Sequence, residues 1–403
     1  MKKAYRFLVL ALVLILLMLT GCAAKDDGSQ WRGKEYRQTA FSDDGYYYLA
    51  YSSLLCFRDN RSGNNVILCS KVGCKHGYRD ANGVDRPEAD CEANLGALSG
   101  IDSVVDFSGD RIYYIVDEQG SLRLMSRDAT GTAEKIVATI GEAYLDGNTS
   151  LMAKDLIVAG EYAYCTLIVQ SAQQNAETGA VEVNLEKNVL CRIQLSNGKQ
   201  TQLHEEKVNE ITLAAAKTDE VVFLVYDRPA ADSPNLEEEL RSYPVYFYVW
   251  RESTGKTEKA AELTSDQCGT VRSCEEGKLY LVLGKETETI FKTFDLNDHT
   301  VSDHAAIANV ALFINRDYML CKDSAGAYQL YSVKKNQYLP VDVDSNTLAV
   351  AATGSQGFVL RSIQTEYAGE GVQHVIGTMY NYVRYRDLAD GLQEKDLTPF
   401  YQE

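Results

Sequence analysis

The chain has 403 residues, with 57 acidic and 40 basic side chains, so its formal net charge is −17. Binding to nucleic acid needs clustered lysine and arginine, and no such cluster follows the first few residues, so the composition excludes nucleic acid as a partner. Twenty-six tyrosines favour strands, because aromatic side chains suit a half-buried pleated surface. Only six prolines occur, and no low-complexity linker divides the chain into separate domains.

The first 22 residues have the form of an export signal. Lys2, Lys3 and Arg6 precede an apolar run at 7–19, which ends at the small residues before Cys22. The run is shorter than the roughly 20 apolar residues of a membrane-spanning helix. Cleavage before Cys22 is therefore expected.

The motif Leu19-Thr20-Gly21-Cys22 resembles the lipobox of bacterial lipoproteins. The resemblance implies a signal peptide at 1–21, a thioether-linked diacylglycerol on Cys22 and a lipidated tether over 22–35. It implies that the protein sits on the extracytoplasmic face of the cell membrane, with the membrane as a partner through this anchor. An ordinary secretory signal or an uncleaved anchor would also place the chain outside the cytoplasm.

One unit recurs along residues 36–403: a short strand rich in Tyr, Phe and Leu, a polar turn that usually holds Gly or Asn, and a second strand. Asn-Gly and Thr-Gly pairs favour hairpin turns, which require positive φ. The seventh unit is expected to turn at Asp390-Gly391. The first strands of the seven expected hairpins are 54–58, 122–125, 190–193, 246–250, 291–294, 328–332 and 380–385.

A further strand precedes each hairpin, and a weaker strand comes before that one, as at 103–107 and 310–313. Four-stranded units at this spacing predict an all-β fold, a β-propeller of about seven antiparallel blades over 36–403. Dividing the long unit between residues 140 and 210 would give eight blades, and discounting the first unit would give six. The best candidate for a helix is the short segment 235–241.

The segment Cys69, Cys74, His76 and Cys91 concentrates three thiols and an imidazole just after the first hairpin. Three cysteines and one histidine form a ligand set that Zn²⁺ takes in tetrahedral structural sites. The spacing is not that of a standard zinc finger, so disulfide bonds and reduced packing thiols remain open alternatives. In none of these interpretations is the segment catalytic.

Two cysteine pairs are candidates for disulfides across a hairpin. Cys56 and Cys69 fall opposite each other if the first hairpin turns symmetrically at Ser62-Gly63, and Cys165 and Cys191 do so about Thr178. Directly opposed residues bring their Cβ atoms to roughly 4.5–5.5 Å, close to bonding range. With Cys22 lipidated, nine cysteines remain, so at least one thiol stays unpaired.

The tyrosine-rich units and the cysteine segment resemble those of extracytoplasmic β-propeller lipoproteins from anaerobic Gram-positive bacteria. The resemblance covers 36–403 by pattern. It implies a membrane-anchored propeller that works close to the membrane, because the expected tether is short.

Two functions are open. The first is a binding module for a protein, peptide or glycan, such as a neighbouring envelope protein, with Trp31, Tyr243 and Tyr246 as aromatic contacts or as packing residues. The second is an exported polysaccharide hydrolase or lyase with its site at the propeller mouth. Converging carboxylates or histidines from three or more blades would favour the enzyme; no catalytic residue is nominated from the sequence.

Overall fold

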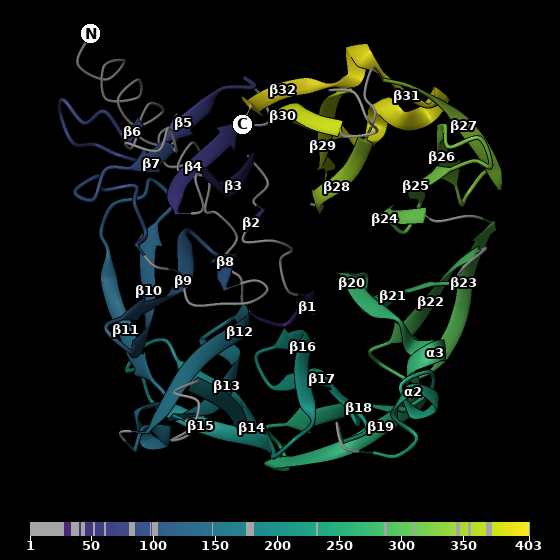
Figure 1. Ribbon diagram of the computed structural model, residues 1–403. Helices are drawn as coiled ribbons and strands as arrows, with labels where there is room; N and C mark the ends of the chain where they lie inside the picture. The colour runs from purple at the N-terminus through teal and green to yellow at the C-terminus, as the bar shows by residue number, and fades with distance from the viewer. Residues whose placement is uncertain are drawn as a thin grey trace, which may run out of the picture.

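A computed structural model describes residues 28–33, 40–41, 45–50, 53–59, 62–79, 85–96, 98, 104–146, 148–174, 181–230, 233–285, 288–308, 311–343, 347–353, 356–367 and 373–402. Seven antiparallel sheets of these residues stand side by side in a ring (Figure 1). The ring confirms the prediction of an all-β propeller with seven blades.

Each blade contains four strands, and the first of them lies nearest the central axis while the fourth forms the rim (Figure 1). Blade 1 consists of β2 (Ala40–Phe41), β3 (Gly45–Ala50), β4 (Leu54–Asp59) and β5 (Asn65–Ile67). Blade 2 consists of β8 (Val105–Ser108), β9 (Arg111–Glu118), β10 (Ser121–Asp128) and β11 (Lys135–Ile140). Blade 3 consists of β12 (Thr149–Ala159), β13 (Tyr162–Gln174), β14 (Val181–Gln194) and β15 (Gln200–Glu206). Blade 4 consists of β16 (Glu210–Lys217), β17 (Glu220–Tyr226), β18 (Pro244–Arg251) and β19 (Lys256–Thr264).

The remaining blades follow the same order. Blade 5 consists of β20 (Thr270–Glu275), β21 (Lys278–Gly284), β22 (Glu288–Asp295) and β23 (Val301–Ala308). Blade 6 consists of β24 (Ala311–Asn315), β25 (Tyr318–Lys322), β26 (Tyr328–Ser332) and β27 (Gln337–Asp342). Blade 7 consists of β28 (Thr347–Thr353), β29 (Gly357–Tyr367), β30 (Gln373–Arg384) and β32 (Thr398–Gln402). The short helix α2 (Leu236–Glu239) lies where the sequence predicts it, and α3 (Ser265–Cys268) leads into blade 5.

The two faces of the ring carry different turns. We call one of them the first-turn face, because it holds the turns between the first and second strands of the blades. In blades 2 to 6 these turns lie at 109–110, 160–161, 218–219, 276–277 and 316–317. On this face one backbone hydrogen bond of 2.8–2.9 Å recurs in all five blades and ties that turn to the turn between the third and fourth strands. The donor and acceptor pairs are Ala129 to Asp110, Leu195 to Glu161, Glu252 to Asp219, Leu296 to Gly277 and Val333 to Asp317.

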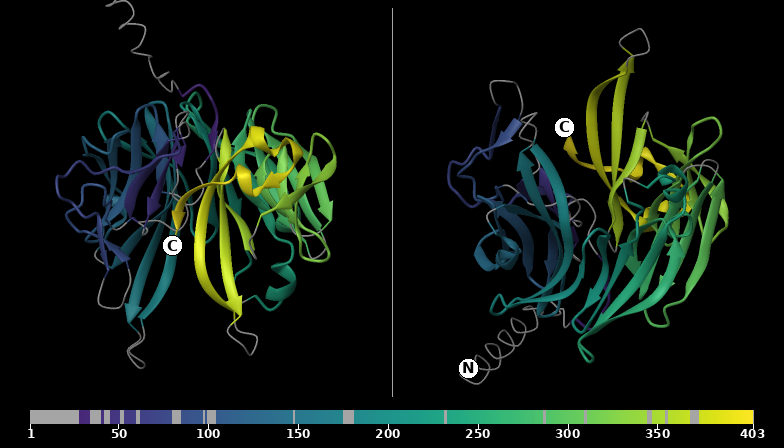
Figure 2. Two further views of the ribbon diagram at one scale, coloured as in Figure 1. Left: turned by 90° about the horizontal axis from the view of Figure 1, so that it is seen from above. Right: turned by 60° about the horizontal axis from the view of Figure 1, so that its bottom comes forward.

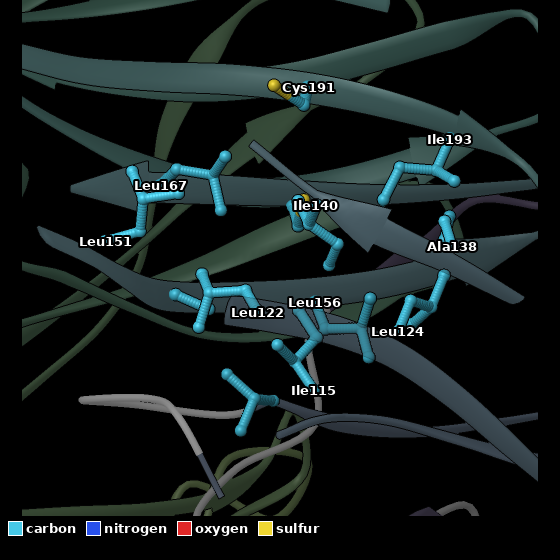
Figure 3. Packing of buried hydrophobic residues seen from close by; sticks show 14 of the residues in the cluster. Ile115, Leu122, Leu124, Ala138, Ile140, Leu151, Leu156, Leu167, Cys191 and Ile193 are labelled. Atoms are coloured by element: carbon cyan, nitrogen blue, oxygen red, sulfur yellow. The ribbon is translucent and has the colours of Figure 1, made fainter. Parts of the chain in front are cut away.

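The long hairpins β13–β14 and β29–β30 project beyond the ring on the opposite face (Figure 2). The blades pack through apolar side chains on both sides of their inner strands, and in β17 residues 221–225 are all at most 1% exposed. Such strands read as continuous apolar runs because both of their surfaces are covered. Figure 3 shows the cluster between blades 2 and 3, which contains side chains of both blades, such as Leu124 and Leu167.

The ring closes between blades 1 and 7, at what we call the seam. Blade 1 takes all four strands from the start of the chain, and blade 7 takes all four from the end, so no strand is shared across the closure. Side-chain packing holds the two blades together: the rings of Tyr46 and Tyr382 lie 5.5 Å apart, and Cys56 and Val359 belong to the same buried cluster.

The end of the chain departs from the predicted seventh hairpin. Instead of turning at Asp390-Gly391, the chain forms the 3-10 helix η2 (Tyr385–Asp390), and β31 (Leu392–Gln393) then pairs with β27 of blade 6 in parallel. After η3 (Glu394–Asp396), β32 returns to pair with β30. The detour buries Leu388 and Leu392 completely between blades 6 and 7. Burial of these two apolar side chains stabilises this path of the chain over a simple hairpin.

Residues 28–33 form a strap against the inner strands, whereas the sequence places them in the tether 22–35. Within the strap, β1 (Arg32–Gly33) pairs with Ala216 and Ala215 of β16 in blade 4. The strap pairs with the edge of β16, and its Arg32 contacts the buried carboxylate of Asp106. A tether boundary drawn from composition cannot reveal these contacts, because their partners lie far away in the chain. Among the described residues no helix is long and apolar enough to cross a membrane.

Candidate functional site

The structure brings the predicted ligand set Cys69, Cys74, His76 and Cys91 together. Their sulfur and ring nitrogen atoms all lie within 4.8 Å of one another. The sulfur of Cys91 is 3.7 Å from Nδ1 of His76. We call these four residues the Cys₃His cluster.

The local backbone explains how ligands so irregularly spaced can meet. Cys69 lies two residues after the end of β5. The loop then turns at Gly73, whose φ of +80° is left-handed. His76 is also left-handed, with φ of 65°, so Cys74 and His76 face the same point although only one residue separates them. The hairpin of β6 (Gly77–Arg79) and β7 (Asp85–Pro87) then returns the chain to Cys91.

Backbone N–H groups favour the ionised form of each of the three thiols, against the effect of burial on the pKa. Burial opposes ionisation of Cys69, but hydrogen bonds from the N–H groups of Lys71 and Glu92 lower the pKa of this thiol. Desolvation raises the pKa of Cys74 to about 12, although the N–H of His76, 3.4 Å from the sulfur, counteracts it. Burial likewise raises the pKa of Cys91, against a hydrogen bond from the N–H of Ala93.

The cluster is attached to the body of blade 1 and lies against the seam. The N–H of Leu55 donates to the carbonyl of Ala93 at 2.8 Å, and the N–H of Leu95 donates to Ser53 at 2.9 Å. Cys91 belongs to the buried cluster of the seam, and Cys69 and Cys74 pack against that cluster. The Cys₃His cluster is therefore part of the region where the ring closes.

The two predicted disulfide pairs differ in outcome. Cys165 and Cys191 are directly opposed on β13 and β14, as the sequence predicts, and both are buried free thiols in this structure. Burial raises the pKa of Cys191 to about 11. The predicted register of Cys56 with Cys69 is wrong: Cys56 pairs with Ile67, because the hairpin is centred one residue earlier in the chain than the predicted turn at Ser62-Gly63.

The aromatic residues predicted as possible contacts pack into the fold. Trp31 and Tyr243 lie against the apolar cluster between blades 4 and 5, and Tyr246 lies against the cluster between blades 3 and 4. The ammonium of Lys217 is 5.1 Å from the ring centre of Trp31. Cys22, the predicted lipidation site, falls outside the described residues.

The strap is fixed by polar contacts that the sequence did not reveal. Arg32 donates to the carbonyl of Val158 at 2.5 Å and to Asp106 at 3.0 Å, so it joins β12 of blade 3 to β8 of blade 2. Asp106 is fully buried, and its second oxygen accepts the N–H of Val158 at 2.6 Å.

Gly28 marks the point where the strap reaches the first-turn face. Its carbonyl accepts the N–H of Thr218 at 2.9 Å. Its φ is +70°, and a Cβ there would lie 1.8 Å from the Thr218 hydroxyl, so only glycine fits. From Gly28 the strap runs inward along β16.

A polar cavity of about 310 Å³ opens toward the opposite face between blades 3, 4 and 5. Glu210 is the first residue of β16. Its carboxylate forms ion pairs with the ammonium of Lys154 at 2.5 Å and with the guanidinium of Arg228 at 2.7 Å. Lys154 also donates to the hydroxyl of Thr212 at 2.7 Å. A charged pair, Lys154-Asp155, inside an apolar strand was the sequence signal that could have pointed to this site.

No family model matches the sequence, and no curated protein matches it. Among solved structures, the chain is similar to a puromycin hydrolase, at 10% identity and a TM-score of 0.51, over 91% of this chain and 54% of that one. It is similar to dipeptidyl peptidase 4 of Porphyromonas gingivalis, at 10% identity and a TM-score of 0.51, over 94% of this chain and 61% of that one. The chain thus spans little more than half the length of these hydrolases, and the likeness shows the propeller fold alone.

Proposed function

We propose that this protein is a lipid-anchored, extracytoplasmic β-propeller that binds a protein, peptide or glycan on the face opposite its anchor. The observation that carries the proposal is the strap, which fixes where the N-terminal segment meets the ring. The sequence before the strap, with its lipobox at Cys22, supplies the anchor in this proposal.

Gly28 is the sixth residue after Cys22, and a fully extended chain of that length spans roughly 20 Å. Gly28 lies beside Thr218 on the first-turn face. A lipid on Cys22 would therefore hold the first-turn face close to the membrane. The opposite face would point away from it, since β16, which crosses the ring from Lys217 to Glu210, is about 23 Å long.

The opposite face has the features of a binding surface. The hairpin β13–β14 projects from it, and on this hairpin Val183 is 60% exposed and Leu185 is 43% exposed. The cavity around Glu210 opens on the same side of the ring. Exposed apolar side chains next to polar groups are typical of interaction surfaces.

The alternative function, a polysaccharide hydrolase or lyase, gains less support from the described cavities. The cavity near β16 contains one carboxylate, Glu210, and both of its oxygens are occupied by cations. A second cavity of about 200 Å³, between the inner strands of blades 5, 6 and 7, is lined by Arg272 and apolar or hydroxyl side chains. Among the described lining residues, no pair of carboxylates converges.

Epitope accessibility tests the orientation. One epitope is inserted in the turn at Glu276-Gly277 on the first-turn face, and another in the β13–β14 loop at 175–180. In spheroplasts we expect antibody to bind only the second epitope in the wild-type chain. A Cys22→Ala variant should leave the membrane fraction and expose both. Equal access to both epitopes in membrane-bound wild type would contradict the orientation, and a wild type as soluble as the variant would contradict the anchor.

Charge substitution tests the binding surface. Val183→Glu combined with Leu185→Glu should reduce the recovery of partners cross-linked to the protein in membranes at least severalfold. Ile136→Glu, at a residue that is 53% exposed on the rim strand β11, is the matched control and should leave recovery unchanged. If both variants recover the same partners as the wild type, the hairpin is not the binding surface.

A further inference from the structure

We propose that Cys69, Cys74, His76 and Cys91 bind one Zn²⁺ ion, and that this ion locks the seam between the first and last blades. The inference does not depend on lipidation or on the binding function proposed above. It assigns the Cys₃His cluster a structural role in closing the ring.

The donor set and its dimensions fit zinc. Zn²⁺ binds thiolate at about 2.3 Å and imidazole nitrogen at about 2.0–2.1 Å, so ligand atoms of a tetrahedral site lie roughly 3.5–3.8 Å from one another. The four donor atoms here lie within 4.8 Å of one another, and the contact between Cys91 and His76 is 3.7 Å. A contraction of about one ångström or less brings all four into the first coordination sphere. On binding, each thiol releases its proton to solvent and the histidine ligates as neutral imidazole.

The backbone supplies a donor to one of the sulfurs. The N–H of His76, two residues further along the chain, donates to the sulfur of Cys74 at 3.4 Å. Such N–H groups stabilise negative charge on sulfur, because hydrogen bonds to an ionised acceptor are stronger than those to a neutral one. Thiols that only fill space in a core do not need this arrangement.

The same geometry disfavours a disulfide as the purpose of the cluster. A disulfide joins two sulfurs and leaves the third cysteine and His76 without a role. Here all three sulfurs and Nδ1 or Nε2 of the histidine face a common point. A single ion uses all four groups, and its charge offsets the three thiolates.

The position of the cluster connects the ion to ring closure. The described parts of the segment after β5, residues 68–79 and 85–96, form the cluster and lie beside β4, where Ala93 accepts from Leu55. Cys91 and Ala93 are buried together with Ala351, Val359 and Tyr382 of blade 7. No strand crosses this seam, so Cys91 and Ala93 are contacts of the segment with blade 7, while its Glu92 carbonyl accepts from Arg127 of blade 2. An ion that fixes the segment therefore fixes the seam.

Metal content tests the site itself. The full chain is purified without chelator under anaerobic conditions, and zinc is measured by mass spectrometry of the metal. We expect about one zinc per chain for the wild type and less than a tenth of that for Cys91→Ser. Cys274→Ser, at a thiol far from the cluster, is the matched control and should keep its zinc. If Cys91→Ser does not fold, Co²⁺ exchanged into the wild type should give the visible bands of a tetrahedral thiolate site. Zinc-free wild type, or a disulfide within the segment in intact-mass analysis, would overturn the proposal.

Hydrogen exchange tests the lock. When a strong chelator removes zinc from the wild type, we expect amide exchange to rise at least tenfold in β3, β4, β28 and β29. The β13–β14 hairpin of blade 3 should be unchanged. If zinc leaves and exchange at the seam stays the same, the ion serves only the loop, and its role in closing the ring is wrong.

Discussion

The interface between blades 2 and 3 and the seam between blades 1 and 7 solve the same packing problem with different means. Among the described residues, the interface buries eighteen apolar residues, including Cys165 and Cys191, in one cluster. The buried cluster of the seam has nine described residues; Cys91 is one of them, and the other ligands of the Cys₃His cluster gather beside it. Cysteine thus has two roles in one ring. Inside the larger cluster its thiol is a small apolar group, and beside the smaller one it is a candidate ligand.

In our proposal the ring closes without a shared strand because a metal-ion cross-link supplements packing at the seam. Burial of apolar surface stabilises by about 25 cal/mol per Å², so the larger cluster of described residues contributes more to its interface than the smaller one. At the seam the chain also lacks the covalent continuity that joins every other pair of neighbouring blades. Of the four predictions below, the first two test this difference directly and the last two concern contacts outside both regions; the largest expected effect comes first.

Tyr46→Ala should destabilise the seam most. The ring of Tyr46 is fully buried against Tyr382, and removing a buried aromatic ring costs about 3–5 kcal/mol of unfolding free energy. Urea unfolding should show this loss. Because zinc and Tyr46 support the same seam, chelation after the substitution should cost less than the sum of the two separate effects. Strict additivity would mean that the ion and the seam are independent.

Leu167→Ala should destabilise the other interface by about 2–5 kcal/mol, since Leu167 is fully buried on β13 and its loss leaves a cavity. Here the comparison predicts additivity: the loss should be the same with and without chelator, within about 0.5 kcal/mol. The midpoints of urea unfolding of the wild type and of Leu167→Ala, each measured with zinc and with chelator, give the four values needed. A marked dependence on chelator would show that the metal acts on the whole ring.

The sequence predicts the blades better than their connections. The repeated hairpin turns and apolar strands are local patterns, so the second and third strands of blades 1 to 7 lie where residue type alone places them. The register of Cys165 with Cys191 is also local, and it is confirmed. The detour of Leu388 and the docking of Arg32 depend on partners far away in the chain, and no pattern near these residues signals them.

The candidate site shows the same division. The ligand types of the Cys₃His cluster are visible in the sequence, but the left-handed backbone at His76 that makes the short spacing workable is not. The pairing of Cys56 with Cys69 failed because symmetry about a turn assumes a loop length that the sequence does not specify. Whether four donors share one centre is therefore a property of the fold.

Asp106→Asn tests the strap, a third way of joining blades. The carboxylate of Asp106 is fully buried and accepts from Arg32 and from the N–H of Val158. The amide keeps the shape but loses the charge partner of a guanidinium that is 19% exposed, so we expect a loss of about 2 kcal/mol. Limited proteolysis should then cut the strap sooner, while zinc content stays at the wild-type level. Loss of zinc in this variant would mean that the strap and the seam are coupled.

The smallest expected effect concerns an ion pair in blade 4, away from both regions. Burial alone would raise the pKa of Glu220, but hydrogen bonds from Lys217 and Arg251 outweigh it and hold the pKa below its ordinary value. Because the folded-state pKa is the lower one, the carboxylate contributes stability above the pKa of the unfolded chain. That contribution is lost as the pH falls through the folded-state pKa.

Glu220→Gln should therefore lower the unfolding free energy by about 0.5–1 kcal/mol near neutral pH, after allowance for solvent screening, and by progressively less as the pH falls through the folded-state pKa of Glu220. Acid also strips metal from thiolate sites, but that affects wild type and variant alike, so the difference between them isolates the ion pair. Glu258→Gln is the matched control, because Glu258 contacts the same Arg251 at 3.2 Å yet is 59% exposed, and its effect should be within error. If the two variants shift the urea midpoint equally, the pairing of Glu220 is no stronger than an ordinary surface contact.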